Sequence, residues 1–276
     1  MRAALVQLNS GDDPAQNLPV TLGLIDEAAA LGSQFVLTPE VTNCVSSSRS
    51  WQQSVLQTQD QDQTLAALRD AARNHRIWLL IGSLALKTSD ADGRFANRSF
   101  LITPEGEIAA WYDKIHMFDV AVSETETYHE SKGYRPGDRA VVAQMPFGKL
   151  GMTICYDLRF AHLYRHLAKS GADVIAVPAA FSPATGAAHW EVLLRARAIE
   201  TGSYVLAPAQ TGHHAASKGR PRATYGHSLI VDPWGKVLAD GGESRGIITV
   251  DLEPSKVANA RMSIPAMTHD TEFGGP

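Results

Sequence analysis

Segments with helical spacing and segments with strand-like spacing alternate along almost the whole chain. From Asn17 to Leu31, apolar residues recur every three or four positions, which predicts a helix that Gly32 can end. The short apolar run from Gln34 to Pro39 then predicts a buried strand. A chain built from such units folds as an α/β protein. Its 276 residues, 44% of them hydrophobic, suffice for one domain with a large core, and no linker or repeat divides them.

The remaining elements follow the same pattern, with hairpin turns such as the one at Gly106 between some of the strands. Helices are predicted over Thr64–Asn74, from a cap at Asp157 to Gly171, over Trp190–Thr201 and from Pro254 onward. Strands are predicted at Arg2–Leu8, Ile77–Ser83, Ser99–Thr103, Ile108–Tyr112, Ala140–Met145, Leu150–Ile154, Asp173–Ala179, Tyr204–Ala209, Ser228–Asp232, Lys236–Ala239 and Ile247–Leu252. The pattern alone does not decide whether these strands form one sheet or two.

Cys155 lies where an apolar run gives way to a helix-like segment that begins at Tyr156. At such a junction the free N–H groups and the dipole of the helix favour a thiolate and can bind an oxyanion. A cysteine there is suited to be a nucleophile, although a lone cysteine is more often a buried structural residue. A disulfide with Cys44 is the less favoured arrangement, because two cysteines in a chain of this size indicate a reducing compartment.

Two ionisable residues stand in settings that would assist a thiol. Glu40 follows the predicted strand that ends at Pro39, so burial should raise its pKa into the range useful for proton transfer. Lys114, in the segment Tyr112–Asp119, would supply a cation. Taken singly, each side chain is equally well explained as a solvated charge.

Glu40, Lys114 and Cys155, in this order and in these settings, resemble the Glu-Lys-Cys triad of the nitrilase superfamily of carbon–nitrogen hydrolases. The resemblance runs from about Met1 to about Met267. It implies a four-layer αββα sandwich, with a single domain over residues 1–267 and a flexible tail over 268–276. It also implies homodimers in which helical layers pack together.

The resemblance also implies roles for individual residues. Glu40 would be the general base, while Lys114 and the backbone N–H of Tyr156 would bind the oxyanion. Glu130 would help to orient the lysine and the substrate, unless it is an ordinary loop carboxylate.

Three further residues are candidates for substrate binding. Arg159, four positions after the nucleophile, is suited to bind a substrate carboxylate, and an ion pair with Asp157 or Glu191 is the competing explanation. Phe181 and Thr185 would line the pocket by an apolar contact and a hydroxyl, although Phe181 could equally belong to the core. The basic loop His213–Arg222 would either overhang the site and attract an anion or be simply solvated.

Several segments resemble the Nit-type amidases and, among them, the deaminated glutathione amidases: His116–Val120, Cys155–Phe160, Pro178–Glu191, Arg195–Thr201 and Tyr225–Gly235. Those enzymes split N-(4-oxoglutarate)-cysteinylglycine into 2-oxoglutarate and cysteinylglycine. The resemblance therefore implies a small acidic amide as the substrate and a cysteine thioester as the intermediate. The alternatives are an ω-amidase acting on 2-oxoglutaramate or 2-oxosuccinamate, and a non-catalytic binding module with the same fold.

The composition limits the partners. A net charge of −4 gives no support for a nucleic-acid partner, and no stretch approaches the ~20 apolar residues that cross a membrane. The ten histidines show no metal-ligand spacing, and no glycine-rich phosphate-binding motif occurs, so neither a metal nor a cofactor is expected. The first residues read as a strand rather than a signal peptide, and we expect a cytoplasmic protein.

Overall fold

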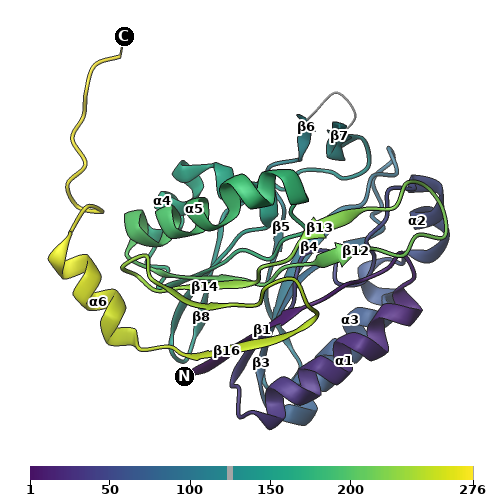
Figure 1. Ribbon diagram of the computed structural model, residues 1–276, viewed down its shortest axis with the longest axis horizontal. Helices are drawn as coiled ribbons and strands as arrows, with labels where there is room; N and C mark the ends of the chain where they lie inside the picture. The colour runs from purple at the N-terminus through teal and green to yellow at the C-terminus, as the bar shows by residue number, and fades with distance from the viewer. Residues whose placement is uncertain (123–126, 276) are drawn as a thin grey trace.

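The computed structural model describes residues 1–122 and 127–275, and these form two stacked six-stranded sheets with helices outside them (Figure 1). Strands of the first sheet run in the order β16-β1-β2-β3-β4-β5. Its three central strands are parallel, and the outer ones are antiparallel to their neighbours. The bounds are β1 (Arg2–Gln7), β2 (Phe35–Leu37), β3 (Trp78–Leu86), β4 (Ala96–Ile102), β5 (Ile108–Asp113) and β16 (Gly246–Asp251).

The second sheet repeats this arrangement in the order β15-β14-β11-β10-β9-β8. Here β9, β10 and β11 are parallel, and hairpins close both edges. The bounds are β8 (Val141–Met145), β9 (Gly148–Met152), β10 (Val174–Ala176), β11 (Tyr204–Ala207), β14 (Leu229–Val231) and β15 (Val237–Asp240). Two short ladders stand apart: β6 (Asp119–Ala121) with β7 (Thr127–His129), and β12 (Thr211–His213) with β13 (Ala223–Tyr225).

Helices α1 (Pro14–Ala30) and α3 (Gln63–His75) cover the first sheet, and α4 (Ala161–Lys169) and α5 (Pro183–Thr201) cover the second (Figure 1). The side chains of β1 point alternately to the two faces of the first sheet, and both faces are buried. Ala3 and Leu5 point into the core between the sheets, while Ala4 and Val6 belong to the core beneath the helices. These are the four layers that the resemblance implied, and the expected αββα sandwich is confirmed.

Some element boundaries differ from the sequence prediction. Helix α5 begins at Pro183 rather than at Trp190, with proline at a position that needs no N–H donor. Helix α4 begins only at Ala161, and Asp157 does not cap it, because its side chain accepts bonds elsewhere. Helix α2 (Arg49–Val55) was not predicted from the polar serine-rich segment that contains it.

The C-terminal helix α6 (Pro254–Ser263) begins at the predicted proline. Beyond it, Asp270 forms ion pairs with Arg165 and Lys169 of α4, and residue 276 lies outside the described residues. The division into a domain over 1–267 and a tail over 268–276 stays a prediction. None of the helices in the described ranges is long and apolar enough to span a lipid bilayer.

Candidate active site

The predicted triad residues come from both sheets and meet in one cavity of about 780 Å3. Glu40 follows β2, Lys114 follows β5, and Cys155 comes after β9. All three lie at the carboxyl ends of strands, the edge where ligands of α/β proteins bind. Both Glu130 and Tyr156 line the same cavity. The residues that the sequence analysis grouped as one site therefore do lie close together in the fold.

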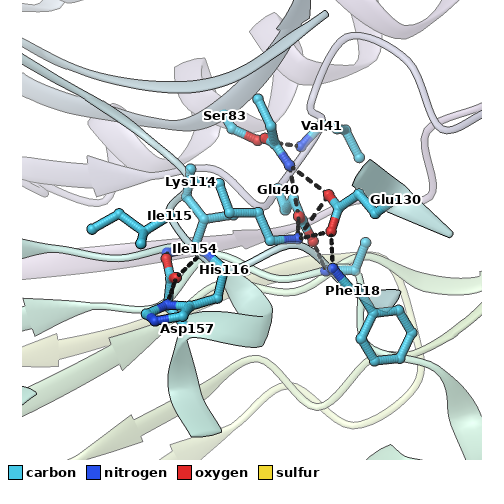
Figure 2. Close-up of polar contacts among 12 residues, drawn as sticks. Glu40, Val41, Ser83, Lys114, Ile115, His116, Phe118, Glu130, Ile154 and Asp157 are labelled. Carbon is cyan, nitrogen blue, oxygen red and sulfur yellow. Dashed lines mark hydrogen bonds and ion pairs between the residues drawn. The ribbon is translucent and has the colours of Figure 1, made fainter. Parts of the chain in front are cut away.

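Lys114 lies between two carboxylates (Figure 2). Its Nζ is 2.8 Å from Oε1 of Glu40 and 2.9 Å from each carboxylate oxygen of Glu130. The lysine side chain is 2% exposed, so these contacts replace nearly all of its hydration. Glu130 also accepts a bond from the backbone N–H of Phe118 at 2.7 Å, which fixes the carboxylate against the segment that carries the lysine.

Glu40 is held from all sides. Besides Lys114, its Oε1 accepts a bond from the Nδ2 of Asn97 at 2.9 Å, and its Oε2 accepts one from the backbone N–H of Ala180 at 2.9 Å. Ala180 follows β10 of the second sheet, whereas Glu40 belongs to the first. Cys155 lines the same cavity as Glu40, and burial together with the negative charge of Glu40 raises the pKa of its thiol. The carboxylate thus sits at the junction of the two sheets.

Cys155 stands in a strained backbone conformation. Its φ of 49° lies in the left-handed region that non-glycine residues rarely adopt. The backbone N–H of Cys155 bonds to the carbonyl of Pro178 at 2.9 Å, which ties the turn to the loop after β10. The next segment is a 3₁₀ helix, η3 (Cys155–Arg159), instead of the α-helix expected to begin there. In the described part of the chain, nothing accepts the N–H of Tyr156, which leaves this donor free at the cavity.

Asp157 fastens this turn to the segment that carries Lys114. One of its oxygens accepts bonds from the backbone N–H and Nδ1 of His116, at 3.0 and 2.7 Å. The other accepts bonds from Tyr112 Oη at 2.7 Å and from the N–H of Ile154 at 2.8 Å. The carboxylate is fully buried, and its hydrogen bonds link segments that belong to the two sheets (Figure 2). This role replaces the helix cap that the sequence suggested.

The pKa of Glu40 is shifted in the direction opposite to the sequence prediction. Burial alone raises the pKa of this carboxyl, as expected. The attraction of Lys114 and the hydrogen bonds from Lys114, Cys155 and Asn97 outweigh burial and hold the pKa below its ordinary value. Glu40 is therefore an ionised base in the resting site, and the predicted upward shift is wrong.

The prediction of a resting thiolate is also wrong. Burial and the negative charge of Glu40 raise the pKa of the Cys155 thiol well above its ordinary value, against the opposing effect of Lys114. For Lys114, burial lowers the pKa, but the charges of Glu130, Glu40 and Cys155 raise it further and leave it well above normal. The resting site thus combines a carboxylate, an ammonium and a protonated thiol.

Gly82 permits the close approach of the sheets behind Glu40. A Cβ built there would lie 2.0 Å from the carbonyl oxygen of Thr38 and 2.5 Å from Cβ of Pro178. Thr38 precedes Glu40 in the first sheet, and Pro178 accepts the N–H of Cys155 in the second. Only a glycine fits between the Thr38 carbonyl and the ring of Pro178.

The candidate substrate residues lie at one side of the cavity. Phe181 and Thr185 line it, and Phe181 also packs in the core against Trp190. Arg159 is the exception, because it is not among the described lining residues: its guanidinium lies 5.5 Å from the centre of the Phe181 ring and bonds to Nδ1 of His189 at 3.3 Å. No ion pair joins it to Asp157 or Glu191 among the described residues, which removes the structural explanation considered for it.

Several lining residues were not found from the sequence. Asn97 lies in β4, which begins at Ala96 rather than at the predicted Ser99, because the polar residues Asn97 and Arg98 obscured the start of the strand. An asparagine flanked by strand-like residues was the available signal, since strands are depleted in this residue. Arg49, Arg220 and Arg222 also line the cavity, so the loop that ends at Arg222 does reach the site.

A buried thiol that shares a cavity with a carboxylate, an ammonium and a free backbone N–H has the parts needed for acyl transfer. The carbon-nitrogen hydrolase family model matches residues 2–262. The chain belongs to the carbon–nitrogen hydrolase family. The match covers both sheets and every described residue that lines the cavity.

Curated relatives and solved structures agree with this membership of the nitrilase superfamily. The deaminated glutathione amidase of Yersinia enterocolitica is 38% identical over 97% of this chain and 92% of its own length. That of Synechocystis sp. is 39% identical over 97% of each chain. The crystal structure of Saccharomyces cerevisiae Nit3, a member of branch 10 of the superfamily, matches with a TM-score of 0.85 at 28% identity, over 98% of this chain and 96% of that one.

Proposed function

We propose that this protein is a cysteine-dependent amidase that hydrolyses deaminated glutathione to 2-oxoglutarate and cysteinylglycine. The observation that carries the proposal is the gathering of Glu40, Lys114 and Cys155 in one cavity, where Lys114 Nζ lies 2.8 Å from Oε1 of Glu40. The names of the similar Yersinia and Synechocystis proteins support the choice of substrate.

The first half of the reaction forms a thioester. Glu40 takes the proton of Cys155 as the sulfur attacks the amide carbonyl carbon. The oxyanion that develops is bound by the N–H of Tyr156 and by Lys114. The ammonium has three N–H groups, of which Glu40 accepts one and the two oxygens of Glu130 share another, so the third can reach the oxyanion. Glu40 then returns the proton to the leaving amine as the carbon–nitrogen bond breaks.

The second half hydrolyses the thioester. Glu40, again a carboxylate, takes a proton from water as the oxygen attacks the acyl carbon. The same donors bind the second oxyanion, and the carbon–sulfur bond breaks. Glu40 then protonates Cys155, which restores the resting site. The raised thiol pKa suits this cycle, because sulfur is protonated except when substrate is present.

The leaving group distinguishes this function from its nearest rival, an ω-amidase. On one preparation of the wild-type protein, we expect kcat/KM for deaminated glutathione to exceed that for 2-oxoglutaramate by at least about tenfold. The first substrate releases a dipeptide amine and the second releases ammonia, so each product can be assayed separately. A preference for 2-oxoglutaramate would establish the rival, and turnover of neither would favour the non-catalytic binding module.

We also propose that the protein forms homodimers through its outer helical layer and works in the cytoplasm. Val192 and Ile199, seven positions apart on α5, are 67% and 55% exposed on one face of that helix. Two free cysteines suit a reducing compartment. We expect light scattering after size exclusion to give twice the chain mass, and Ile199→Asp to shift it toward the monomer. A monomeric wild type would contradict the dimer.

A further inference from the structure

The outer part of the cavity is positively charged, although the chain carries a net charge of −4. Apart from Lys114, four cations are among the described lining residues: Arg49, Lys132, Arg220 and Arg222. The acidic side chains described there are Glu40 and Glu130, and both already bind Lys114. A cavity with such an excess of cations favours an anionic ligand.

Arg222 is distinct from the other cations of the cavity. It is half-buried, and its Nε is enclosed without a hydrogen-bond partner among the residues that the structure describes. Within the described ranges, no carboxylate pairs with its guanidinium, whereas Arg98, which is also half-buried, binds Asp113 at 2.7 Å. A partly desolvated cation without a partner is costly, and a bound anion would relieve that cost.

The loop before Arg222 is anchored rather than simply solvated. His214 is buried, donates from Nδ1 to the carbonyl of Ser10 and contacts Thr224 Oγ1 through Nε2 at 2.7 Å. Its backbone N–H bonds to the carbonyl of Arg222 at 2.9 Å. Burial lowers the pKa of His214 to about 4, so this anchor is neutral at pH 7. Arg222 is thus held in place before any ligand arrives.

The position of Arg222 indicates which part of the substrate it would meet. The chain runs from Glu40 along the cavity wall to Ser47, whose Oγ donates to the carbonyl of Arg220 at 2.8 Å. Glu40 protonates the leaving amine in the mechanism above, so the leaving group extends along this wall. Arg159 lies instead beyond Cys155, beside Phe181.

We propose that Arg222 binds the carboxylate at the far end of the leaving amine, which makes the site selective for amides whose leaving group is a short anionic peptide. This inference rests on the proposed function and adds a residue that determines specificity. Its guanidinium is suited to a two-point contact with a carboxylate. Arg159 remains available for the carboxylate of the acyl half.

The test compares two substrates that differ only at that carboxylate. Deaminated glutathione and its C-terminal glycinamide analogue are assayed with wild type and with Arg222→Gln. For the wild type we expect kcat/KM to be ~10–100-fold higher with the carboxylate substrate than with the amide analogue, which is the usual contribution of a hydrogen-bonded charge pair. The variant should lose about this factor with the carboxylate, and less than about threefold with the amide. Equal losses with both substrates would overturn the inference.

Lys218→Gln is the matched control, because it removes a charge from the same loop at a residue that lies outside the cavity lining. Both kcat/KM values should stay within about twofold of wild type. If the wild type fails to cleave deaminated glutathione, the proposed function fails. Cleavage of both substrates at equal rates by the wild type refutes only the role of Arg222.

A measurement on the wild type alone covers the case in which Arg222→Gln does not fold. Cysteinylglycine and cysteinylglycinamide are compared as product inhibitors. We expect the inhibition constant of cysteinylglycine to be at least ~10-fold lower than that of cysteinylglycinamide, because only the carboxylate form makes the charged contact with Arg222. Equal inhibition by the two dipeptides would overturn the inference.

Discussion

The Cys155→Ala protein is expected to bind substrate and remain folded but to lose turnover by on the order of 10⁴-fold or more, because no other group can form the thioester. The thiol is a small part of the core, and alanine tolerates the same backbone conformation no worse than cysteine. Thermal unfolding should therefore occur within a few degrees of the wild type, about the change expected for a loss of 1 kcal/mol.

Mass spectrometry of quenched wild-type enzyme provides the direct check. Trypsin should release Cys155 in the peptide Leu150–Arg159, which is expected to carry the acyl group of the substrate. Cys44 serves as an internal control, because burial raises the pKa of its thiol to about 12 and leaves it unreactive. Near-normal turnover by Cys155→Ala, or an adduct on Cys44 instead, would refute the assignment of the nucleophile.

Replacing Lys114 by methionine is expected to damage stability and activity together. The change leaves the carboxylates of Glu40 and Glu130 buried without their shared cation, which should cost about 3–5 kcal/mol of unfolding free energy. The loss of an oxyanion donor should lower kcat by at least ~10²-fold. Denaturant unfolding and steady-state kinetics measure the two effects. The exposed Lys236→Met is the matched control and should change neither.

A double variant separates the two roles of Lys114. Lys114→Met with Glu130→Gln removes one of the two uncompensated charges, so it should recover part of the lost stability while turnover stays low. Lowering the pH should likewise recover part of the lost stability of the single variant Lys114→Met. Without the cation, burial raises the folded pKa of Glu40 above its unfolded value, so the variant gains stability as pH falls through that pKa. Full activity in either variant would contradict the proposed role of the lysine.

Most helices and strands could be predicted from the local sequence. Their buried residues recur every three or four positions in a helix and every second position in a strand, and this spacing is visible in the sequence. The early part of α5 was missed because Thr185 and Gly186 read as a loop. In the structure Gly186 packs directly on Tyr225, where a Cβ would lie 2.3 Å from the ring, and this contact between distant residues leaves no local signal. The left-handed conformation of Cys155 is similarly set by the bond to Pro178 rather than by its neighbours.

The site was predictable in its residues but not in its charges. Glu40, Lys114 and Cys155 could be recognised in the sequence by their settings. The direction of the Glu40 pKa depends on a 2.8 Å contact with Lys114, and the distance between residues so far apart in the chain follows only from the packing of the sheets. Asn97 was missed as a site residue, and the loop that ends at Arg222 was left between two explanations, because the neighbours of these residues in sequence do not indicate what they face.

The close packing at Gly82 has a consequence for how the protein becomes active during folding. The first sheet carries Glu40 and Lys114, the second carries Cys155, and the ring of Pro178 packs against Gly82 with no room for a side chain on that residue. Neither half of the chain alone contains a working site. Contacts of such high sequence separation form late and slowly. Recovery of activity during refolding should therefore report the docking of the two sheets, after the secondary structure of each has formed.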